Sequence, residues 1–458
     1  MNNDSTIRDI CQREIESRCY SHQIYGISVY NYLKRRIRNK ELKRFDLDLH
    51  QSYPPIDYKE WLFSIIKSLF QLIILIIKRE KHDNLIHSFS RVDSVNDVYL
   101  DKFTDPLIEY SNIGEDYFIF QKGIKGRHYK NRLHSENLIY IDAISALGFV
   151  YTSLFWRVFY ARNKKTLTSL LTSINEAFPQ IELSISSLSK SIAHSLFITI
   201  CLNKLLKLME VKRVFAPSRS DFLHLIPAAK MSNTKVYELQ HGITYGETIT
   251  YSGFQDPLFT PDKFLLFGDV SPKNVYGINE AKIFIIGWAF GKYVEDNVRN
   301  SKLEESSVLV ISEPHITDRL LSVIATLAND NPNIVFYFRP HPLEILSTKQ
   351  KNMIDNRTNI RMDDNKQNLL STLTRFKYVI GENSTALYEA LSLRKEVGKI
   401  NMGGLHPKYL QKEDENYFYE ITDNLSFVDF INRTFSNKHS KNIYSTFKPE
   451  VINNLLIG

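Results

Sequence analysis

The feature that most constrains this chain is the alternation of short apolar strands with helical segments along its second half. Strands are expected at residues 213–216, 235–239, 264–267 and 282–286, and again at 308–312, 334–338, 378–380 and 396–400. Strands that alternate with helices form parallel, doubly wound sheets. The polar segment 295–306 separates the two series. We therefore predict an α/β protein with two Rossmann-like domains that face a cleft.

The first part of the chain carries a different pattern. Apolar residues recur at helical spacing through most of the first 90 residues and again over 166–207. We expect residues 1–300 to form a Rossmann-like domain with helical additions, including a helical N-terminal extension. Residues 301–458 are expected to form the second Rossmann-like domain.

Composition limits the class of protein. The net charge of +7 is modest for 458 residues and does not by itself argue for nucleic acid, so no nucleic-acid partner is expected. The three cysteines form no disulfide framework and no zinc-binding spacing. The polar N-terminus has no apolar signal-peptide core. We expect a cytoplasmic location.

The apolar run Trp61–Ile77 has several interpretations. It could be a buried helix of the first domain, a helix lying in the membrane interface, or a membrane span at the short limit of length. Lys67 interrupts it and Lys78, Arg79 and Lys81 follow it. We expect the run to be helical and not to span a membrane, which leaves possible peripheral contact at the inner face of the cytoplasmic membrane.

The segment FYFRPHPLE, residues 336–344, places charged groups directly after a strand. Prolines stiffen the turn that carries Arg339, His341 and Pro342. An arginine and a histidine held at the carboxyl end of a strand make a natural anion site. The alternative is a proline-rich turn with a surface histidine.

The segment IGENSTALYEAL, residues 380–391, predicts a strand, a turn and the start of a helix. Ser384 and Thr385 begin that helix, Glu382 precedes them, and Glu389 lies one turn further on. Hydroxyls and free backbone N–H groups at a helix N-terminus suit phosphate. A simple helix cap explains the same residues. Phosphate binding is favoured because we expect this segment and His341 to end successive strands of one sheet.

The segment YELQHGITYGETITYSG, residues 237–253, ends a strand of the first series at Gln240, His241 and Gly242. We expect these residues to face the cleft from the first domain, with His241 facing His341. Glu238 and Glu247 are the nearest carboxylates. A core histidine beside a tight glycine turn is the alternative interpretation.

Together these motifs resemble bacterial GT-B glycosyltransferases of capsule and lipopolysaccharide synthesis that use CMP-sialic acid or CMP-Kdo. More loosely, they resemble teichoic-acid polyol-phosphate transferases. The resemblance covers about residues 210–405. It implies that His341 and Pro342 contact the donor phosphate and that Ser384 and Thr385 contact the same region. It also points to Gln240, His241 and Gly242.

The resemblance implies transfer of a sugar from a nucleotide donor to a surface glycan or lipid-linked glycan. It implies that residues 301–458 bind the donor and residues 1–300 the acceptor. Arg339, His341 and the helix N-terminus would neutralise the leaving phosphate, so no metal and no cofactor is expected. The DxD pattern at Asp46–Asp48 reads as a solvated turn.

The catalytic base is the main departure from these enzymes. The acidic D/E-D/E-G motif of the sialyltransferases has only a partial counterpart in Glu115 and Asp116, which no glycine follows. Candidates for catalysis are therefore His241, Glu247, Glu115 and Asp116. A polyol-phosphate transferase, a nucleotide-sugar epimerase and a nucleotide-sugar-binding assembly or sensor subunit remain alternatives.

Overall fold

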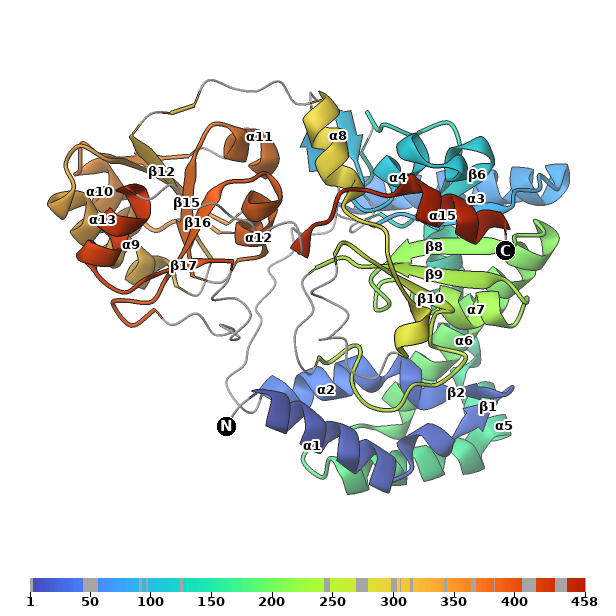
Figure 1. The fold of residues 1–458 in the computed structure, drawn as a ribbon. Coiled ribbons are helices and arrows are strands. Elements are labelled where there is room, and N and C mark those ends of the chain that lie inside the picture. The colour runs from blue at the N-terminus through green and yellow to red at the C-terminus, as the bar shows by residue number, and fades with distance from the viewer. Residues whose placement is uncertain are drawn as a thin grey trace.

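Two parallel sheets form the frame of the computed structural model, which describes residues 3–457 except for a set of loops and turns. The excepted residues are 44–56, 90–92, 96–97, 124–126, 130, 243–247, 269–278, 298–302, 305, 314–315, 342–343, 364–367, 383, 406–416 and 433–442. Figure 1 shows the two sheets in separate lobes, with the N-terminal helices against the first. The expected α/β class with two Rossmann-like domains is confirmed.

The first sheet has seven strands in the order β11-β10-β9-β8-β3-β6-β7, all parallel. Its strands are β3 (Asn84–His87), β6 (Tyr117–Gln121), β7 (Leu138–Tyr140), β8 (Arg213–Pro217), β9 (Lys235–Leu239), β10 (Lys263–Leu266) and β11 (Ile283–Ile285). The four strands expected from the sequence are all present. Strands β3, β6 and β7 were not expected, because each is short and flanked by polar residues, which hides its pattern in the sequence.

Helices cover this sheet and extend it. They are α3 (Tyr58–Lys78), α4 (Asp105–Tyr110), α5 (Asp142–Ala177), α6 (Ile185–Leu208), α7 (Leu225–Lys230) and α8 (Ala289–Asn297). Beyond the sheet, α1 (Asn3–Glu16) and α2 (Lys34–Lys43) pack with parts of α5 and α6 around a separate apolar core. In that core Arg38 is buried against Glu14 at 2.6 Å and donates to the Ile249 and Ser252 carbonyls. The expected helical N-terminal extension is therefore present.

The second sheet has six parallel strands in the order β14-β13-β12-β15-β16-β17. They are β12 (Ser307–Ile311), β13 (Val335–Arg339), β14 (Ile360–Met362), β15 (Tyr378–Gly381), β16 (Glu396–Ile400) and β17 (Tyr419–Ile421). Its helices are α9 (Thr317–Asp330), α10 (Thr348–Asp355), α11 (Leu369–Thr374), α12 (Thr385–Ser392) and α13 (Asn424–Asn432). The His341 and Ser384 motifs follow strands of one sheet as expected, but these strands are not successive, because β14 lies between them along the chain and β12 lies between them in the sheet.

The end of the chain returns to the first sheet (Figure 1). Helix α15 (Pro449–Ile457) packs there, with the Leu455 carbonyl accepting from the Tyr237 hydroxyl at 3.2 Å and the Leu456 carbonyl accepting from Arg213. The domain boundary near residue 300 stays a prediction. Helix α15 follows that boundary in the sequence, but it packs on the first sheet and not on the second.

Gly287 makes this crossing possible. The Trp288 N–H donates to the Ser445 carbonyl at 2.9 Å, and the Lys448 N–H donates to the Ile286 carbonyl at 2.8 Å. Gly287 has a φ of +78°, and a β-carbon added to it would lie 2.1 Å from the Thr446 carbonyl oxygen. Only glycine meets both the backbone conformation and the close approach.

Gly287→Ala should therefore destabilise the protein more than the same change at Gly26. Gly26 has a similar φ of +75° but open space around its α-carbon. The left-handed backbone alone costs about 1–2 kcal/mol for alanine, and the clash adds about 1–3 kcal/mol at Gly287. Urea unfolding of both variants measures the difference. Equal losses of the free energy of unfolding would show that the 445–448 segment is not held against Gly287.

Candidate functional site

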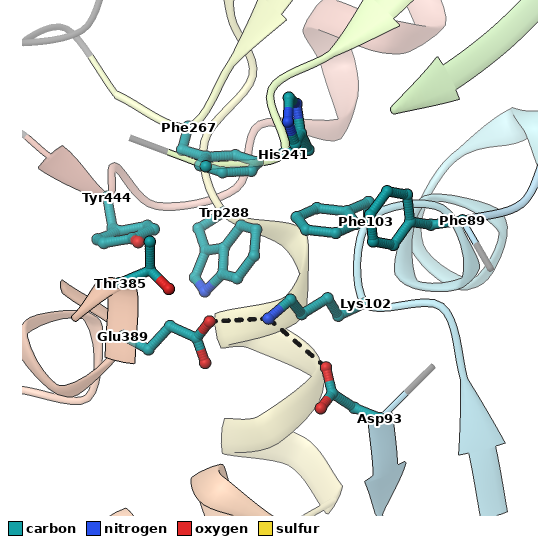
Figure 2. A pocket seen from close by; sticks show the side chains of 11 residues that line it. Phe89, Asp93, Lys102, Phe103, His241, Phe267, Trp288, Thr385, Glu389 and Tyr444 are labelled. Carbon is teal, nitrogen blue, oxygen red and sulfur yellow. Dashed lines mark hydrogen bonds and ion pairs between the residues drawn. The ribbon is translucent and has the colours of Figure 1, made fainter. Parts of the chain in front are cut away.

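A pocket of about 290 Å³ lies between the two domains, at the carboxyl ends of strands from the first sheet (Figure 2). From the first domain it is lined by Phe89, Asp93, Lys102, Phe103, His241, Gly242, Phe267 and Trp288, and from the remainder of the chain by Thr385, Glu389 and Tyr444. Ligands of doubly wound sheets bind at this edge. The pocket is therefore the candidate active site.

His241 reaches the pocket because Gln240 fixes the turn after β9. The buried Gln240 amide donates to the Gly242 carbonyl at 3.0 Å and accepts from the Phe267 N–H at 2.8 Å. Gln240 thus joins the ends of β9 and β10 and does not line the pocket itself. Its role is to hold His241 and Gly242 in place.

The His241 side chain has the chemistry of a neutral base. Burial lowers its pKa below the ordinary value, although the Glu238 and Asp221 carboxylates act in the opposite direction. The imidazole is therefore neutral at pH 7. Its Nδ1 is buried and has no hydrogen-bond partner among the described residues. An orphaned buried nitrogen is costly unless a ligand pairs with it. Figure 2 shows the ring nitrogens on the side away from Trp288, toward the first domain.

Lys102 and Glu389 join the two domains across the pocket. The Lys102 ammonium lies 2.7 Å from a Glu389 carboxylate oxygen and 3.6 Å from Asp93 (Figure 2). Burial alone would lower the pKa of Lys102, but the two carboxylates raise it above its ordinary value. Lys102 therefore remains a cation at neutral pH, directly beside the cavity.

Helix α12 contributes the other half of the pocket. Ser384 caps the helix, its hydroxyl accepting from the Ala386 N–H at 3.3 Å. Thr385 is exposed at the first turn, and Glu389 lies one turn later on the same face. The N-terminus of α12 therefore opens toward a site that also holds a lysine, which is an arrangement that favours an anion.

Aromatic rings form the wall between these charged groups. Trp288 packs edge-on against Phe267 with ring centroids 4.2 Å apart, and Tyr444 lies 5.3 Å from Trp288. Phe103 completes the cluster at 6.3 Å from Trp288. Such surfaces stack against nucleobases or the apolar faces of sugars.

Comparison with known proteins reveals the fold. No family model and no curated protein matches the sequence. Among solved structures, UDP-GlcNAc 2-epimerase from Methanocaldococcus jannaschii superposes with a TM-score of 0.51 at 12% identity, covering 82% of this chain and 99% of that one. The chain has a GT-B fold.

Two further GT-B neighbours superpose less well. A putative UDP-N-acetylglucosamine 2-epimerase from Listeria monocytogenes gives a TM-score of 0.48 at 9% identity, over 82% of this chain and 95% of that one. A glycosyltransferase from Rickettsia africae gives 0.41 at 13% identity, over 82% and 93%. These scores are too low to support an argument, and identities this low establish the fold alone.

The structure brings together only part of the predicted donor site. Thr385 and Glu389 line the pocket, and Ser384 caps their helix, while Glu382 is buried just before them. Arg339 is not available for an anion: its guanidinium is buried and donates to Asp363 at 3.0 Å and to Thr372 at 2.9 Å. It stabilises the sheet edge instead.

His341 does not line the pocket with His241, contrary to the expectation that they face each other there. Its backbone N–H donates to the Glu344 carboxylate at 3.1 Å, and Glu344 also accepts from Thr317. The RPHP turn is thus tied to α9. With β12 between their strands, the His341 and Ser384 motifs start about 10 Å apart. Pro342 lies outside the described residues.

The predicted acidic bases do not reach the pocket. Glu115 and Asp116 precede β6, so they lie at the amino edge of the sheet, opposite the pocket. Asp116 there accepts from the Asp83 N–H at 2.8 Å and contacts His82 at 2.6 Å. Glu238 forms an ion pair with Arg219 at 3.0 Å and accepts a hydrogen bond from the Tyr251 hydroxyl at 3.0 Å. Glu247 and the Asp46–Asp48 pattern lie outside the described residues.

Several pocket residues escaped the sequence analysis. Asp93 begins the short strand β4 (Asp93–Val95), and Lys102 and Phe103 follow its antiparallel partner β5 (Val98–Leu100), in a part of the chain where no strand was expected. Trp288 follows the expected strand 282–286 directly, so its position at a carboxyl end was the one available signal.

Proposed function

We propose that this protein is a glycosyltransferase that moves a sugar from a nucleotide donor to a hydroxyl of a glycan acceptor. The observation that carries the proposal is the interdomain pocket that joins His241 and Gly242 of the first domain to Thr385 and Glu389 of the second. It combines a neutral base, a cation, a helix N-terminus and an aromatic wall. Each of these groups has a role in inverting transfer of a sugar from a nucleotide.

The donor is placed against the second domain. Its phosphate lies between the N-terminus of α12 and the Lys102 ammonium, which favour negative charge. Glu389 accepts hydrogen bonds from sugar or ribose hydroxyls. To do so it gives up part of its contact with Lys102, which frees the ammonium for the phosphate.

The acceptor approaches from the first domain. The neutral His241 takes the proton of the acceptor hydroxyl while the new C–O bond to the sugar forms. The bond from the sugar carbon to the phosphate oxygen breaks, and its electron pair leaves with the nucleotide. Lys102 and the helix N-terminus stabilise the growing charge on that phosphate. Metal independence stays a prediction; the described residues contain no cluster of three potential metal ligands.

The finer assignment concerns the donor and acceptor. We propose a CMP-activated sugar of the Kdo or sialic-acid kind, transferred to a bacterial surface polysaccharide or lipopolysaccharide. The support is the resemblance of the QHG, RPHP and ENST segments to enzymes of that class. The Methanocaldococcus jannaschii protein of similar fold is a UDP-GlcNAc 2-epimerase, so UDP donors belong in the same test.

A nucleotide screen should show stabilisation by one nucleotide above the others. A ligand at 100 times its Kd raises the free energy of unfolding by about 2.7 kcal/mol, which is measurable as a rise in Tm. We expect CMP to stabilise most among CMP, CDP, UDP and GDP at equal concentration. Greater stabilisation by UDP would remove the CMP assignment, and no shift with any of them would remove the nucleotide-sugar proposal.

Turnover then separates the alternative functions. Nucleotide release that depends on an added glycan acceptor supports a transferase. Conversion of the sugar without an acceptor identifies an epimerase. Transfer of a polyol phosphate with release of CMP identifies the teichoic-acid type of reaction, and binding without turnover identifies a non-enzymatic subunit.

A further inference from the structure

Helix α3 exposes an apolar face that water does not favour. It is one of three helices among the described residues that are long and apolar enough to cross a membrane, with α5 and α6. Its exposed large apolar side chains are Trp61, Leu62, Phe63, Ile66, Leu69, Phe70, Ile73, Ile74, Ile76 and Ile77. Phe63 and Phe70 are each 63% exposed and Ile77 is 74% exposed. The interpretation of this run as a buried helix is therefore wrong.

The side of α3 that faces the protein carries Ser64, Ser68 and Gln71 beside Leu72 and Leu75. Gln71 binds the free edge of β7, donating to the Leu138 carbonyl at 2.8 Å and accepting from the Tyr140 N–H at 2.9 Å. One turn earlier, Ser68 donates to the Tyr140 carbonyl at 2.5 Å. The helix thus protects an edge strand with polar side chains. This leaves most of its large apolar side chains outward, the reverse of an ordinary amphipathic surface helix.

These contacts also determine how α3 can meet a membrane. Beneath it, Ser64 contacts His128 at 2.9 Å, and the same ring lies 3.0 Å from the buried Asp142 carboxylate. A helix held along its middle by a sheet edge and by the buried His128–Asp142 pair cannot cross hydrocarbon without carrying these polar groups into it, where they are costly. The helix can only lie along the surface.

Helix α5 adds a second apolar face beside α3. Leu72 and Leu75 of α3 share a core with Ala143 and Ile144 of α5, so the two helices are neighbours. The first half of α5 exposes Leu147, Phe149, Val150, Leu154, Phe155 and Val158. Each of these two adjacent helices therefore leaves a run of large apolar side chains exposed, which on soluble proteins marks an interaction surface.

Cations outnumber acids beside these exposed apolar side chains, although Asp57 and Glu80 flank α3 and Glu80 lies 3.2 Å from Lys78. Exposed Lys59, Lys67, Lys78 and Arg79 lie on or next to α3, where Glu60 is the one acidic residue of the helix. Along α5, Arg157, Arg162, Lys164 and Lys165 are exposed, and the sequence from 143 to 165 contains no acid. Trp156 lies between two cations, with Arg157 at 5.5 Å and Lys190 at 5.0 Å from its ring. Tryptophan and cations of this kind mark the headgroup level of a bilayer.

We propose that the exposed faces of α3 and α5 dock onto the surface of an anionic lipid bilayer without spanning it. Apolar side chains enter the headgroup boundary and the surrounding cations meet lipid phosphates. A second copy of the chain fits less well, because a two-fold contact would set the cationic rims against each other. The inference is independent of the proposed chemistry, since no residue of the pocket takes part in it.

Vesicle flotation tests the docking. Wild-type protein is mixed with vesicles of phosphatidylcholine alone, or with vesicles that also contain about 30% phosphatidylglycerol as the anionic lipid. We expect binding to the anionic vesicles that falls as salt is raised. The variant Phe63→Gln, Phe70→Gln and Ile77→Gln should lower the bound fraction at least tenfold. Replacing Lys78 and Arg79 with glutamine should weaken binding to anionic vesicles alone.

The matched control changes three exposed apolar residues elsewhere: Ile345→Gln, Leu425→Gln and Ile457→Gln, which are 95%, 80% and 87% exposed. It should bind as the wild type does. Equal binding by both triple variants, or no binding of the wild type to anionic vesicles, would overturn the proposal. Light scattering without lipid gives a further test. A wild-type dimer that the α3 triple variant dissociates and the control variant does not would also overturn the proposal. Retention of the cellular protein in carbonate-washed membranes, with release by detergent alone, would establish a span instead.

Discussion

His241→Ala is expected to lower kcat by roughly 10²- to 10⁴-fold, the usual contribution of a general base. Burial keeps the imidazole neutral, so one of its ring nitrogens is unprotonated and can accept a proton. The fold should persist because Gln240, not His241, joins the ends of β9 and β10. Acceptor-dependent release of nucleotide measures the rate, and circular dichroism checks the fold.

The pH dependence gives the same prediction a second readout. A base is active when unprotonated, and the pKa of His241 lies below its ordinary value. Activity should therefore be complete at neutral pH and fall only as the pH drops below about 6.5. Asp116→Asn is the control, since Asp116 lies at the opposite edge of the sheet. If Asp116→Asn lowers the rate as much as His241→Ala does, Asp116 and not His241 acts as the catalytic base.

Glu389→Gln is expected to raise the donor Kd about ten- to a hundredfold. Hydrogen bonds to a charged group contribute about 1.5–3 kcal/mol, which corresponds to that change in binding at about 1.4 kcal/mol per decade. Glutamine keeps the shape but loses the charge that holds both Lys102 and the donor hydroxyls. Titration calorimetry with the stabilising nucleotide sugar measures the effect.

Glu304→Gln is the matched control for Glu389→Gln. Glu304 pairs with Arg375 at 2.8 Å in the second domain, outside the pocket, so its loss should leave donor binding unchanged. If both variants bind the donor as the wild type does, Glu389 serves only to join the domains through Lys102, and the donor lies elsewhere.

The sequence determined the fold class and the position of the chemistry along the chain. Alternation of short apolar strands with helices is a local property, so the strands at 235–239, 308–312 and 378–380 could be predicted from spacing alone. Helices follow from their own periodicity and caps, as in α3 (Tyr58–Lys78), which Asp57 caps. Strand ends in turn identified His241, Thr385 and Glu389, which do line the pocket.

Only the tertiary structure decided which of these residues meet. Strand order places β12 between β13 and β15, which separates His341 from Ser384. The Arg339 guanidinium donates to the Asp363 carboxylate instead of binding an anion. Lys102 enters the site from a loop far away in sequence, through a charge pair with Glu389 that no local pattern encodes. The direction of the apolar face of α3 was decided in the same way. Periodicity shows that a helix has two faces, but hydrogen bonds of Gln71 to the edge of β7 determine which face turns to the protein and which to the outside.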